Sequence, residues 1–180
     1  MNTDEAGATD VLTPEQRRLN MSRIRGKNTR PELTLRRVLH SAGLRYRLHV
    51  RTLPGRPDLV LPKYRAVIFV HGCFWHRHEC PLFRWPRSRE AFWREKLERN
   101  VERDAANKAS LLEAGWRVLT IWECAVKSRA RLSEEQLVSR VRMWLIDGEI
   151  TGTIEGWTTQ LSGEVGSAPA ASSSASSGSG

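Results

Sequence analysis

The stretch AVIFVHGCFWHRHEC, residues 66–80, begins as an unbroken apolar segment and ends as a cluster of histidines and cysteines. Residues 66–70 are all apolar, which is typical of a strand buried on both faces of a sheet. The next ten residues hold three of the five histidines and two of the three cysteines of the chain, together with two large aromatic rings. The stretch therefore predicts a central strand that ends in a loop carrying metal-binding groups.

The sequence on either side of this strand predicts a small mixed sheet with helices on both faces. Helix starts are marked by capping residues followed three residues later by Glu or Gln: Thr13 with Gln16, Thr29 with Glu32, and Ser133 with Gln136. The order of elements, α-α-β-β-β-α-β-α, indicates an α/β fold. The expected strands are residues 44–50, 58–61, 66–70 and 116–122, and the expected helices are residues 13–27, 29–42, 89–114 and 133–145.

The chain has 180 residues, of which 39% are hydrophobic, and this suits one globular domain. We place the domain at about residues 13–150 and expect residues 1–12 to be a disordered leader. Residues 151–180 are expected to be a low-complexity, disordered tail that cannot bury a core, because they end in GSAPAASSSASSGSG. The assignment of residues 151–162 stays open.

The chain is strongly basic, with a net charge of +9 and an isoelectric point near 10.3. Residues 15–50 alone contain ten Lys and Arg against two acids. Such clustering favours nucleic acid as the partner, because Lys and Arg displace the counterions condensed on phosphates. The alternative is a merely soluble basic surface.

Cellular location is predicted from what the sequence lacks. The apolar runs are too short to cross a bilayer, and the acidic start MNTDEAGATD has no apolar signal segment. We therefore expect a cytoplasmic protein without a membrane partner. Three cysteines are an odd count, which disfavours a closed set of disulfides, and thiols beside histidines in a reducing compartment more often bind metal.

A structural zinc site is the favoured interpretation of the cysteines. The loop supplies three ligands with the spacing C-x4-H-x-C, and a distant cysteine could complete a closed Cys3His tetrahedron that staples the loop to the sheet. The alternative is that the distant cysteine is a buried core thiol and the loop binds nothing. His76 is a less favoured substitute for His78. The proposed ligands are Cys73, His78, Cys80 and Cys124.

A second constellation points to metal-dependent hydrolysis. Asp58 opens one predicted strand and His71 closes the next, and the short turn between the strands would bring both side chains to one place. A carboxylate suits Mg²⁺ and an imidazole suits proton transfer near neutral pH. Glu32 could add an oxygen ligand, directly or through water. Phosphodiester hydrolysis needs such parts, although Asp58 could instead be a turn-capping aspartate.

Six strings in this sequence resemble one known family, the very-short-patch repair (Vsr) mismatch endonucleases. They occur in order and with compatible spacing, from about Asn20 to Trp144, and neither tail is included. The strings are PGRPD (54–58), VIFVHGCFWH (67–76), FW (92–93), NVERD (100–104), GWRVL (115–119) and IWECA (121–125).

The resemblance implies a restriction-endonuclease-like fold, in which a mixed central sheet is flanked by helices and carries a structural zinc loop. It implies a Mg²⁺-dependent endonuclease that nicks one strand of double-stranded DNA. The nick falls 5′ of the thymine in a T·G mismatch, which arises when 5-methylcytosine is deaminated. Contacts with general mismatch-repair proteins are a family-level expectation, and we expect a monomer.

The resemblance also assigns roles to residues. Asp58 corresponds to the metal-binding carboxylate, with Val70 offering its backbone carbonyl to magnesium where a threonine can stand. His71 and His76 correspond to the catalytic histidines, whose division of labour stays open, and Glu32 corresponds to a supporting acid. The acid-x-lysine pair of restriction enzymes is absent, and Phe69-Val70-His71 stands in its place. The zinc ligands implied are the same four, and the residues implied to wedge into the base stack are Phe74, Trp75 and Trp93.

DNA contacts are also expected from the basic first helix. Met21 matches a segment that helps to hold the opened duplex, and Arg23, Arg25 and Lys27 would run along phosphates, which positions the protein without specifying sequence. Zinc would fix the loop so that its rings stand ready at the groove.

Trp116 and Trp122 are interpreted as core residues. Competing functions are a restriction-type enzyme that cuts both strands and a zinc-stapled DNA-binding module without catalysis.

Overall fold

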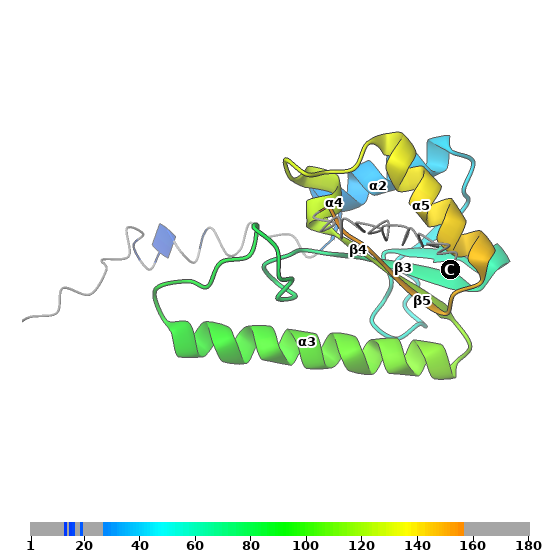
Figure 1. Cartoon of the computed structure of the whole chain (residues 1–180). Coiled ribbons are helices and arrows are strands. Elements are labelled where there is room, and N and C mark those ends of the chain that lie inside the picture. The colour runs from blue at the N-terminus through cyan, green and yellow to red at the C-terminus, as the bar shows by residue number, and fades with distance from the viewer. Residues whose placement is uncertain (1–12, 14, 17–18, 20–26, 157–180) are drawn as a thin grey trace, which may run out of the picture.

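A mixed sheet of five strands forms the centre of the computed structural model (Figure 1). The structure describes residues 13, 15–16, 19 and 27–156. The first three strands are antiparallel neighbours, whereas the last three run parallel to one another. In the order in which they lie side by side, the strands are β1 (Arg47–Leu48), β2 (Leu59–Leu61), β3 (Ala66–His71), β4 (Arg117–Trp122) and β5 (Thr151–Ile154).

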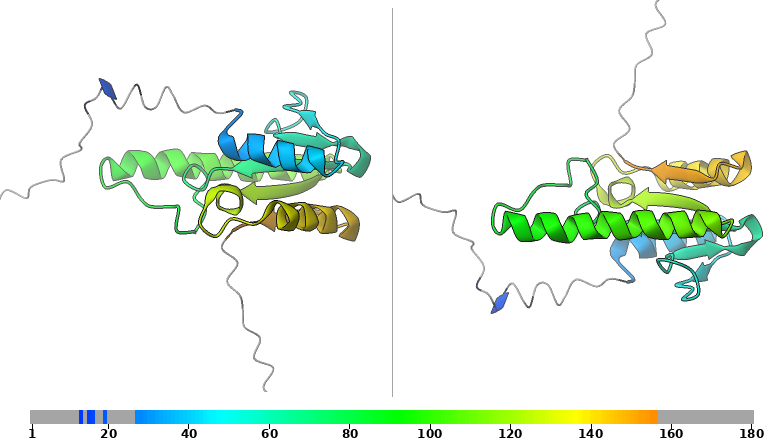
Figure 2. Two further views of the ribbon diagram at one scale, coloured as in Figure 1. Left: turned by 90° about the horizontal axis from the view of Figure 1, so that it is seen from above. Right: turned by 90° about the horizontal axis from the view of Figure 1, so that it is seen from below.

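Different helices cover the two faces of the sheet (Figures 1 and 2). Side chains alternate between the faces along each strand. Ile68 therefore packs with α2 and α5, whereas Val67 and Val118 pack with Leu111 of α3. This confirms the prediction of a mixed α/β sheet with helices on both faces. The helices are α2 (Arg30–Ser41), α4 (Glu123–Lys127) and α5 (Glu134–Asp147) on one face and α3 (Glu90–Glu113) on the other, and a short 3₁₀ turn, η1 (Pro62–Tyr64), joins β2 to β3.

The connection between β3 and β4 decides where the functional segments meet. These strands are parallel and are joined through α3, and their last residues, His71 and Trp122, are paired. Segments that follow parallel strands leave from the same edge of the sheet. Cys73 and Cys124 each lie two residues beyond the end of their strand, so the loop after β3 and the start of α4 are neighbours.

The predicted helix starts are confirmed in the structure. The Thr29 hydroxyl accepts a hydrogen bond from the Glu32 backbone N–H at the start of α2, and Ser133 forms a reciprocal capping box at the start of α5. Thr13 and Gln16 also exchange hydrogen bonds, of 2.9 and 3.1 Å. Each cap satisfies backbone N–H groups that have no partner within a helix.

Two sequence predictions about the fold are wrong in part, and one helix was not predicted. The strand expected at 44–50 is reduced to β1, which ends before His49, a residue with a φ of +46°. The short helix α4 was not predicted. The domain boundary at residue 150 is too early, since residues 151–154 form β5 and pair with β4. That strand buries only Ile154, at 4% exposed, so its local sequence carries no alternating pattern to identify it.

Other predictions fall outside the described residues. They concern the leader 1–12, most of the first helix with Met21, Arg23 and Arg25, and the tail from residue 157 onward. Among the helices that the structure describes, none has the length and apolar character needed to cross a membrane.

Candidate active site and metal centre

A cavity of about 1260 Å³ lies where β2 begins and β3 ends. Asp58, His71 and His76 all line it, together with Glu32 and Lys27. The short η1 turn folds β3 back antiparallel to β2, so the residue before β2 comes to lie beside the last residues of β3. The structure thus brings together the carboxylate and the histidines that the sequence singled out.

Asp58 is held against the end of β3. Its Oδ2 accepts a hydrogen bond of 2.7 Å from the Val70 backbone N–H. Burial raises the pKa of Asp58 to about 6, and the negative charge of Glu32 adds to that effect, whereas the hydrogen bond from Val70 opposes it. A buried carboxylate whose charged form lacks full compensation is suited to receive a cation.

The two candidate catalytic histidines form a stack. The rings of His71 and His76 lie 3.9 Å apart, with 7° between their planes. Burial and the neighbouring His76 lower the pKa of His71 to about 3, so this ring is neutral at physiological pH. His71 can therefore act as a neutral hydrogen-bonding group beside the cavity.

Asp104 completes this group and was not predicted as a site residue. It lies on α3, and its Oδ2 is hydrogen-bonded to Nδ1 of His76. Burial favours a higher pKa for Asp104, but the hydrogen bond and charge of His76 outweigh it and lower the pKa. Asn100 lies one helical turn away on α3 and donates a 3.0 Å hydrogen bond to the Trp75 carbonyl, so the same face of the helix contacts the loop twice.

His71, His76 and Asp104 also form a group that could hold a metal ion, because their ligand atoms lie within 4.8 Å of one another. Two imidazoles and one carboxylate suit a transition metal better than Mg²⁺, which prefers oxygen ligands.

Glu32 is buried at 3% exposed and both of its carboxylate oxygens accept hydrogen bonds. Oε1 accepts one from the Thr29 hydroxyl, and Oε2 accepts from the Asn28 N–H and from Arg36, all at 2.9 Å. These contacts fix Glu32 as an anchored negative charge at the N-terminus of α2. The arrangement suits the supporting position that the sequence suggested.

A third histidine of the cavity was missed by sequence reasoning. His49 lies 2.9 Å from the same Arg36 guanidinium, through Nε2. Burial and the charge of Arg36 lower the pKa of His49, and a neutral ring can accept a hydrogen bond from the guanidinium. His49 was assigned only to a half-exposed strand, and no local pattern distinguishes it from other strand residues.

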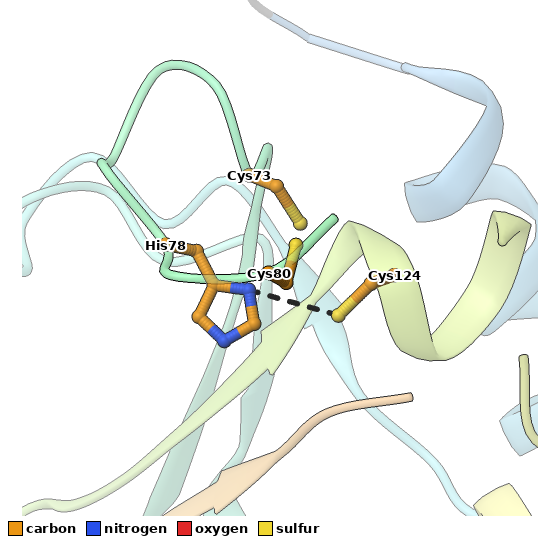
Figure 3. A group of neighbouring side chains, drawn as sticks. All are labelled: Cys73, His78, Cys80 and Cys124. Atoms are coloured by element: carbon orange, nitrogen blue, oxygen red, sulfur yellow. Dashed lines mark hydrogen bonds between the residues drawn. The ribbon is translucent and has the colours of Figure 1, made fainter. Parts of the chain in front are cut away.

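The four predicted zinc ligands converge (Figure 3). Their ligand atoms all lie within 4.8 Å of one another, and Nδ1 of His78 is 3.7 Å from Sγ of Cys124. A tetrahedral zinc with a Zn–S bond of about 2.3 Å and a Zn–N bond of about 2.0–2.1 Å holds the nitrogen and the sulfur about 3.6 Å apart, so this spacing fits. The residues come from two segments: Cys73, His78 and Cys80 from the loop after β3, and Cys124 from α4.

The chemistry of these donors also fits a metal. All three cysteines are free thiols. Burial raises the pKa of the Cys73 and Cys124 thiols, because nothing beside them compensates a thiolate charge fully. A divalent cation supplies that compensation and holds the thiols deprotonated. The cluster could therefore bind a metal, and His76 belongs to the other group.

The predicted wedge aromatics lie together. Phe74 contacts Trp75 and Trp93, with ring centroids 5.1 and 5.4 Å away, and Trp75 and Trp93 are 6.1 Å apart. All three are half-buried and lie outside the two clusters of core residues. The ammonium of Lys96 lies 5.4 Å from the ring of Trp75 and also from that of Trp93. Aromatic faces with an adjacent cation suit stacking against nucleic acid bases.

Trp122 does not belong to the core as predicted. Its ring stacks on His78 at 4.1 Å with 10° between the planes, and it meets His71 edge-on at 5.4 Å. The tryptophan therefore separates the candidate metal centre from the histidine pair. By contrast, Trp116 packs against the core cluster beside α3, as expected.

Several known proteins are similar to this chain over most of their own length. Residues 9–82 match the family described as DNA mismatch endonuclease Vsr. DNA mismatch endonuclease Vsr of Escherichia coli (strain K12) is 46% identical over 136 residues, which cover 76% of this chain and 87% of the relative. The type II nicking enzyme V.XorIIP of Xanthomonas oryzae pv. oryzae is 49% identical over 124 residues, covering 69% and 91%. V.NmeAIP of Neisseria meningitidis, also named a type II nicking enzyme, is 41% identical over 134 residues, covering 74% and 95%.

These relatives are all DNA-cleaving enzymes, and the chain is likewise a DNA endonuclease. It belongs to the family of DNA mismatch endonuclease Vsr, and hence to DNA mismatch repair. The matched residues 9–82 include Asp58, His71 and the loop as far as Cys80, whereas Asp104 and Cys124 lie beyond them.

Proposed function

We propose that this endonuclease is Mg²⁺-dependent and nicks one strand of double-stranded DNA on the 5′ side of the thymine in a T·G mismatch. Such mismatches arise from deamination of 5-methylcytosine. The observation that carries the proposal is one cavity lined by Asp58, His71 and His76 together. A carboxylate for metal and imidazoles for proton transfer are the parts that phosphodiester hydrolysis needs.

We assign magnesium to Asp58 and the backbone carbonyl of Val70. Support comes from the hydrogen bond between the Asp58 carboxylate and the Val70 N–H, which keeps the two residues side by side. The valine side chain need not take part, because only the carbonyl oxygen would serve. When bound, Mg²⁺ would polarise the scissile phosphate and neutralise its developing charge.

His76 is the proposed general base. Asp104, when ionised, only accepts hydrogen bonds, so Nδ1 of His76 carries the proton in their contact and Nε2 is left to accept one from water. A carboxylate in this position orients the imidazole and stabilises the charge gained with the proton. His71, stacked beside it, stays neutral and would bind the phosphate or the water by hydrogen bonds.

Glu32 acts as a supporting acid in this proposal, because its oxygens are already hydrogen-bonded. Its charge raises the pKa of Asp58 and so increases the gain from a bound cation. A water held between the two carboxylates is the route by which Glu32 could reach the metal.

The second metal of the proposal is a structural zinc bound by Cys73, His78, Cys80 and Cys124. Four protein ligands leave no open position for water, so this site fixes structure and takes no part in hydrolysis. It would hold the loop so that Phe74 and Trp75, with Trp93 of α3, can enter the base stack beside the mismatch. A mismatched step unstacks at lower cost than a paired one, so the wedge contributes to discrimination.

The basic N-terminal segment is proposed to hold the duplex. Lys27 lines the cavity, which supports a phosphate contact near the site of cleavage. Met21, Arg23 and Arg25 precede it and complete the proposed DNA contacts. We also propose that the protein acts as a monomer and meets general mismatch-repair proteins.

The fold is proposed to be related to that of type II restriction endonucleases. Support comes from the mixed sheet between helices and from the acid that opens β2 beside the end of β3. The histidine at the end of β3 replaces the lysine that such enzymes carry in their acid-x-lysine pair.

One experiment tests the activity. Purified protein is incubated with duplexes carrying T·G or C·G at one position, with Mg²⁺ or with none added. We expect a Mg²⁺-dependent nick 5′ of the mispaired thymine, lost in Asp58→Asn and retained in Asp147→Asn, which changes an exposed aspartate on α5. Cutting of both strands of the C·G duplex would instead indicate a restriction-type enzyme, and binding without cleavage would refute the assigned chemistry.

A further inference from the structure

The last described residues reach from β5 to the candidate zinc centre. The Glu155 carboxylate lies 2.7 Å from Nε2 of His78. The other ring nitrogen of His78 faces Cys124, with 3.7 Å between Nδ1 and Sγ. One side of this imidazole is therefore directed at the ligand cluster (Figure 3), and the other contacts a carboxylate from the residue directly after β5.

This geometry has a specific chemical meaning for a metal-binding histidine. An imidazole binds metal through an unprotonated nitrogen, and a carboxylate on the opposite N–H fixes the tautomer and makes the ligand more basic. Glu155 would hold the proton on Nε2 and leave Nδ1 free for zinc. The stacked ring of Trp122 restricts the same imidazole from its face.

Gly156 adds a second contact to the same centre. Its backbone N–H donates a hydrogen bond of 3.4 Å to Sγ of Cys124. A Cβ at this position would lie 2.4 Å from the Cys124 carbonyl oxygen and 2.7 Å from that of Ala130. Both atoms belong to the backbone, so only glycine allows the chain to approach the sulfur so closely.

We propose that Glu155 and Gly156 are positioning residues of the zinc centre, and that β5 serves to deliver them. The inference rests on the proposed zinc site and extends it from four ligands to the residues that orient two of them. It assigns a role to two residues of the range 151–162, whose assignment stayed open from the sequence. Neither residue would touch the metal.

The simpler alternative is a surface ion pair without effect on metal binding. The Glu155 side chain is 41% exposed, and ion pairs with an exposed partner are usually weak. His78, however, is only 10% exposed, and its second nitrogen faces the cysteine cluster. The two interpretations predict different zinc affinities when Glu155 is changed.

The test measures zinc retention in the full chain. Wild-type protein, Glu155→Ala, Glu155→Gln and the control Glu149→Ala are purified with zinc, and metal content is measured before and during competition with a chromogenic chelator. Glu149 is an exposed glutamate just before β5, so its removal matches the change of charge. We expect about a 10- to 100-fold loss of zinc affinity in Glu155→Ala and none in Glu149→Ala. Glu155→Gln should lie between, because its amide oxygen still accepts the hydrogen bond.

The possible outcomes separate the inference from the proposed function. If wild-type protein contains no zinc, both the proposed structural zinc site and the proposed role of Glu155 and Gly156 are refuted. If wild type, Glu155→Ala and Glu155→Gln all hold zinc equally well, the role of Glu155 is refuted, whereas the structural zinc site is supported. If Glu155→Ala does not fold, Glu155→Gln still decides the result, since loss of the charge alone should weaken zinc retention measurably. Gly156→Ala should weaken retention as well, and unchanged retention there would remove Gly156 from the proposal.

Discussion

Asp104 of α3 is hydrogen-bonded to His76, and His76 is stacked on His71 at 3.9 Å. The long helix on one face of the sheet thus carries a residue that is hydrogen-bonded to a histidine from the loop after β3. Asp104 lies 28 residues after His76 in the sequence, yet its carboxylate is hydrogen-bonded to Nδ1 of that ring.

The first prediction concerns this contact. Asp104→Asn keeps the shape of the side chain but removes the charge that supports a proton on His76. We expect the single-turnover nicking rate to fall by about 10²- to 10⁴-fold, while affinity for the mismatched duplex, measured by fluorescence anisotropy, stays unchanged. Equal losses in rate and affinity would point instead to a general structural role. The exposed Asp147→Asn serves as the control.

The second prediction concerns Asp58 and pH. Its pKa is about 6 in the folded protein and 3.8 in the reference state, so the folded state binds this proton more tightly. The stability linked to Asp58 is therefore fully present below pH 3.8 and is lost as the pH rises through 6. The difference corresponds to at most about 3 kcal/mol. In magnesium-free buffer at pH 7.5, Asp58→Asn should unfold at a higher temperature than wild type, and this gain should disappear at pH 4. A lower melting temperature at pH 7.5 would contradict the role of burial.

The third prediction concerns the metal staple. Cys124→Ser removes the ligand that joins the loop to α4 and should abolish binding of one zinc per chain. Loss of a structural zinc costs several kcal/mol of folding stability, so the melting temperature should fall strongly. Metal analysis and thermal unfolding are the measurements, with Arg129→Ala, which changes an exposed side chain shortly after α4, as the control. Folded wild-type protein that contains no zinc would rule out the staple.

The fourth prediction concerns the aromatic wedge. Trp75→Ala should lower affinity for the T·G duplex by about 5- to 150-fold, which corresponds to about 1–3 kcal/mol per stacked base. Affinity for the matched duplex should change less, because its intact stack admits the ring less readily. Trp75→Phe should retain most of the discrimination. If both duplexes lose affinity equally in Trp75→Ala, the ring serves packing and not recognition.

The fifth prediction concerns Lys27. A single phosphate contact changes the slope of log affinity against log salt by about 0.9 for duplex DNA. Lys27→Ala should reduce the slope by this amount. It should lower the affinity for the T·G duplex and for the C·G duplex equally. Lys108→Ala, which removes another lysine of the same cavity, tests whether charge at any position has this effect. An unchanged slope in Lys27→Ala would show that this lysine does not contact phosphate.

The sequence predicted those parts of the site that depend on local geometry. A short turn joins two strands, so Asp58 and His71 had to meet, and the loop ligands lie within eight residues of one another. Cys124 was predictable because it closely follows β4, as Cys73 follows β3, and because the chain has no further cysteine.

The remaining parts depend on packing between distant segments. Which face of α3 meets the loop cannot be derived from a helix whose apolar residues are intermittent, so Asp104 was missed. β5 is recognisable only through its pairing with β4, and the contact of Glu155 with His78 was therefore not predicted either. Trp122 was misassigned because an aromatic at the end of a buried strand resembles a core residue. In the folded protein it stands at the edge of the sheet, between two histidines.

The late position of β5 has a consequence for synthesis on the ribosome. Cys73 emerges 83 residues before Gly156, and at roughly 5–20 residues per second this interval lasts about 4–17 seconds. Throughout that time the growing chain carries its tryptophan-rich loop without the strand that closes it. During that interval we expect the aromatic rings of the loop to be more exposed, because β5 has not yet paired with β4 and Glu155 has not yet reached His78.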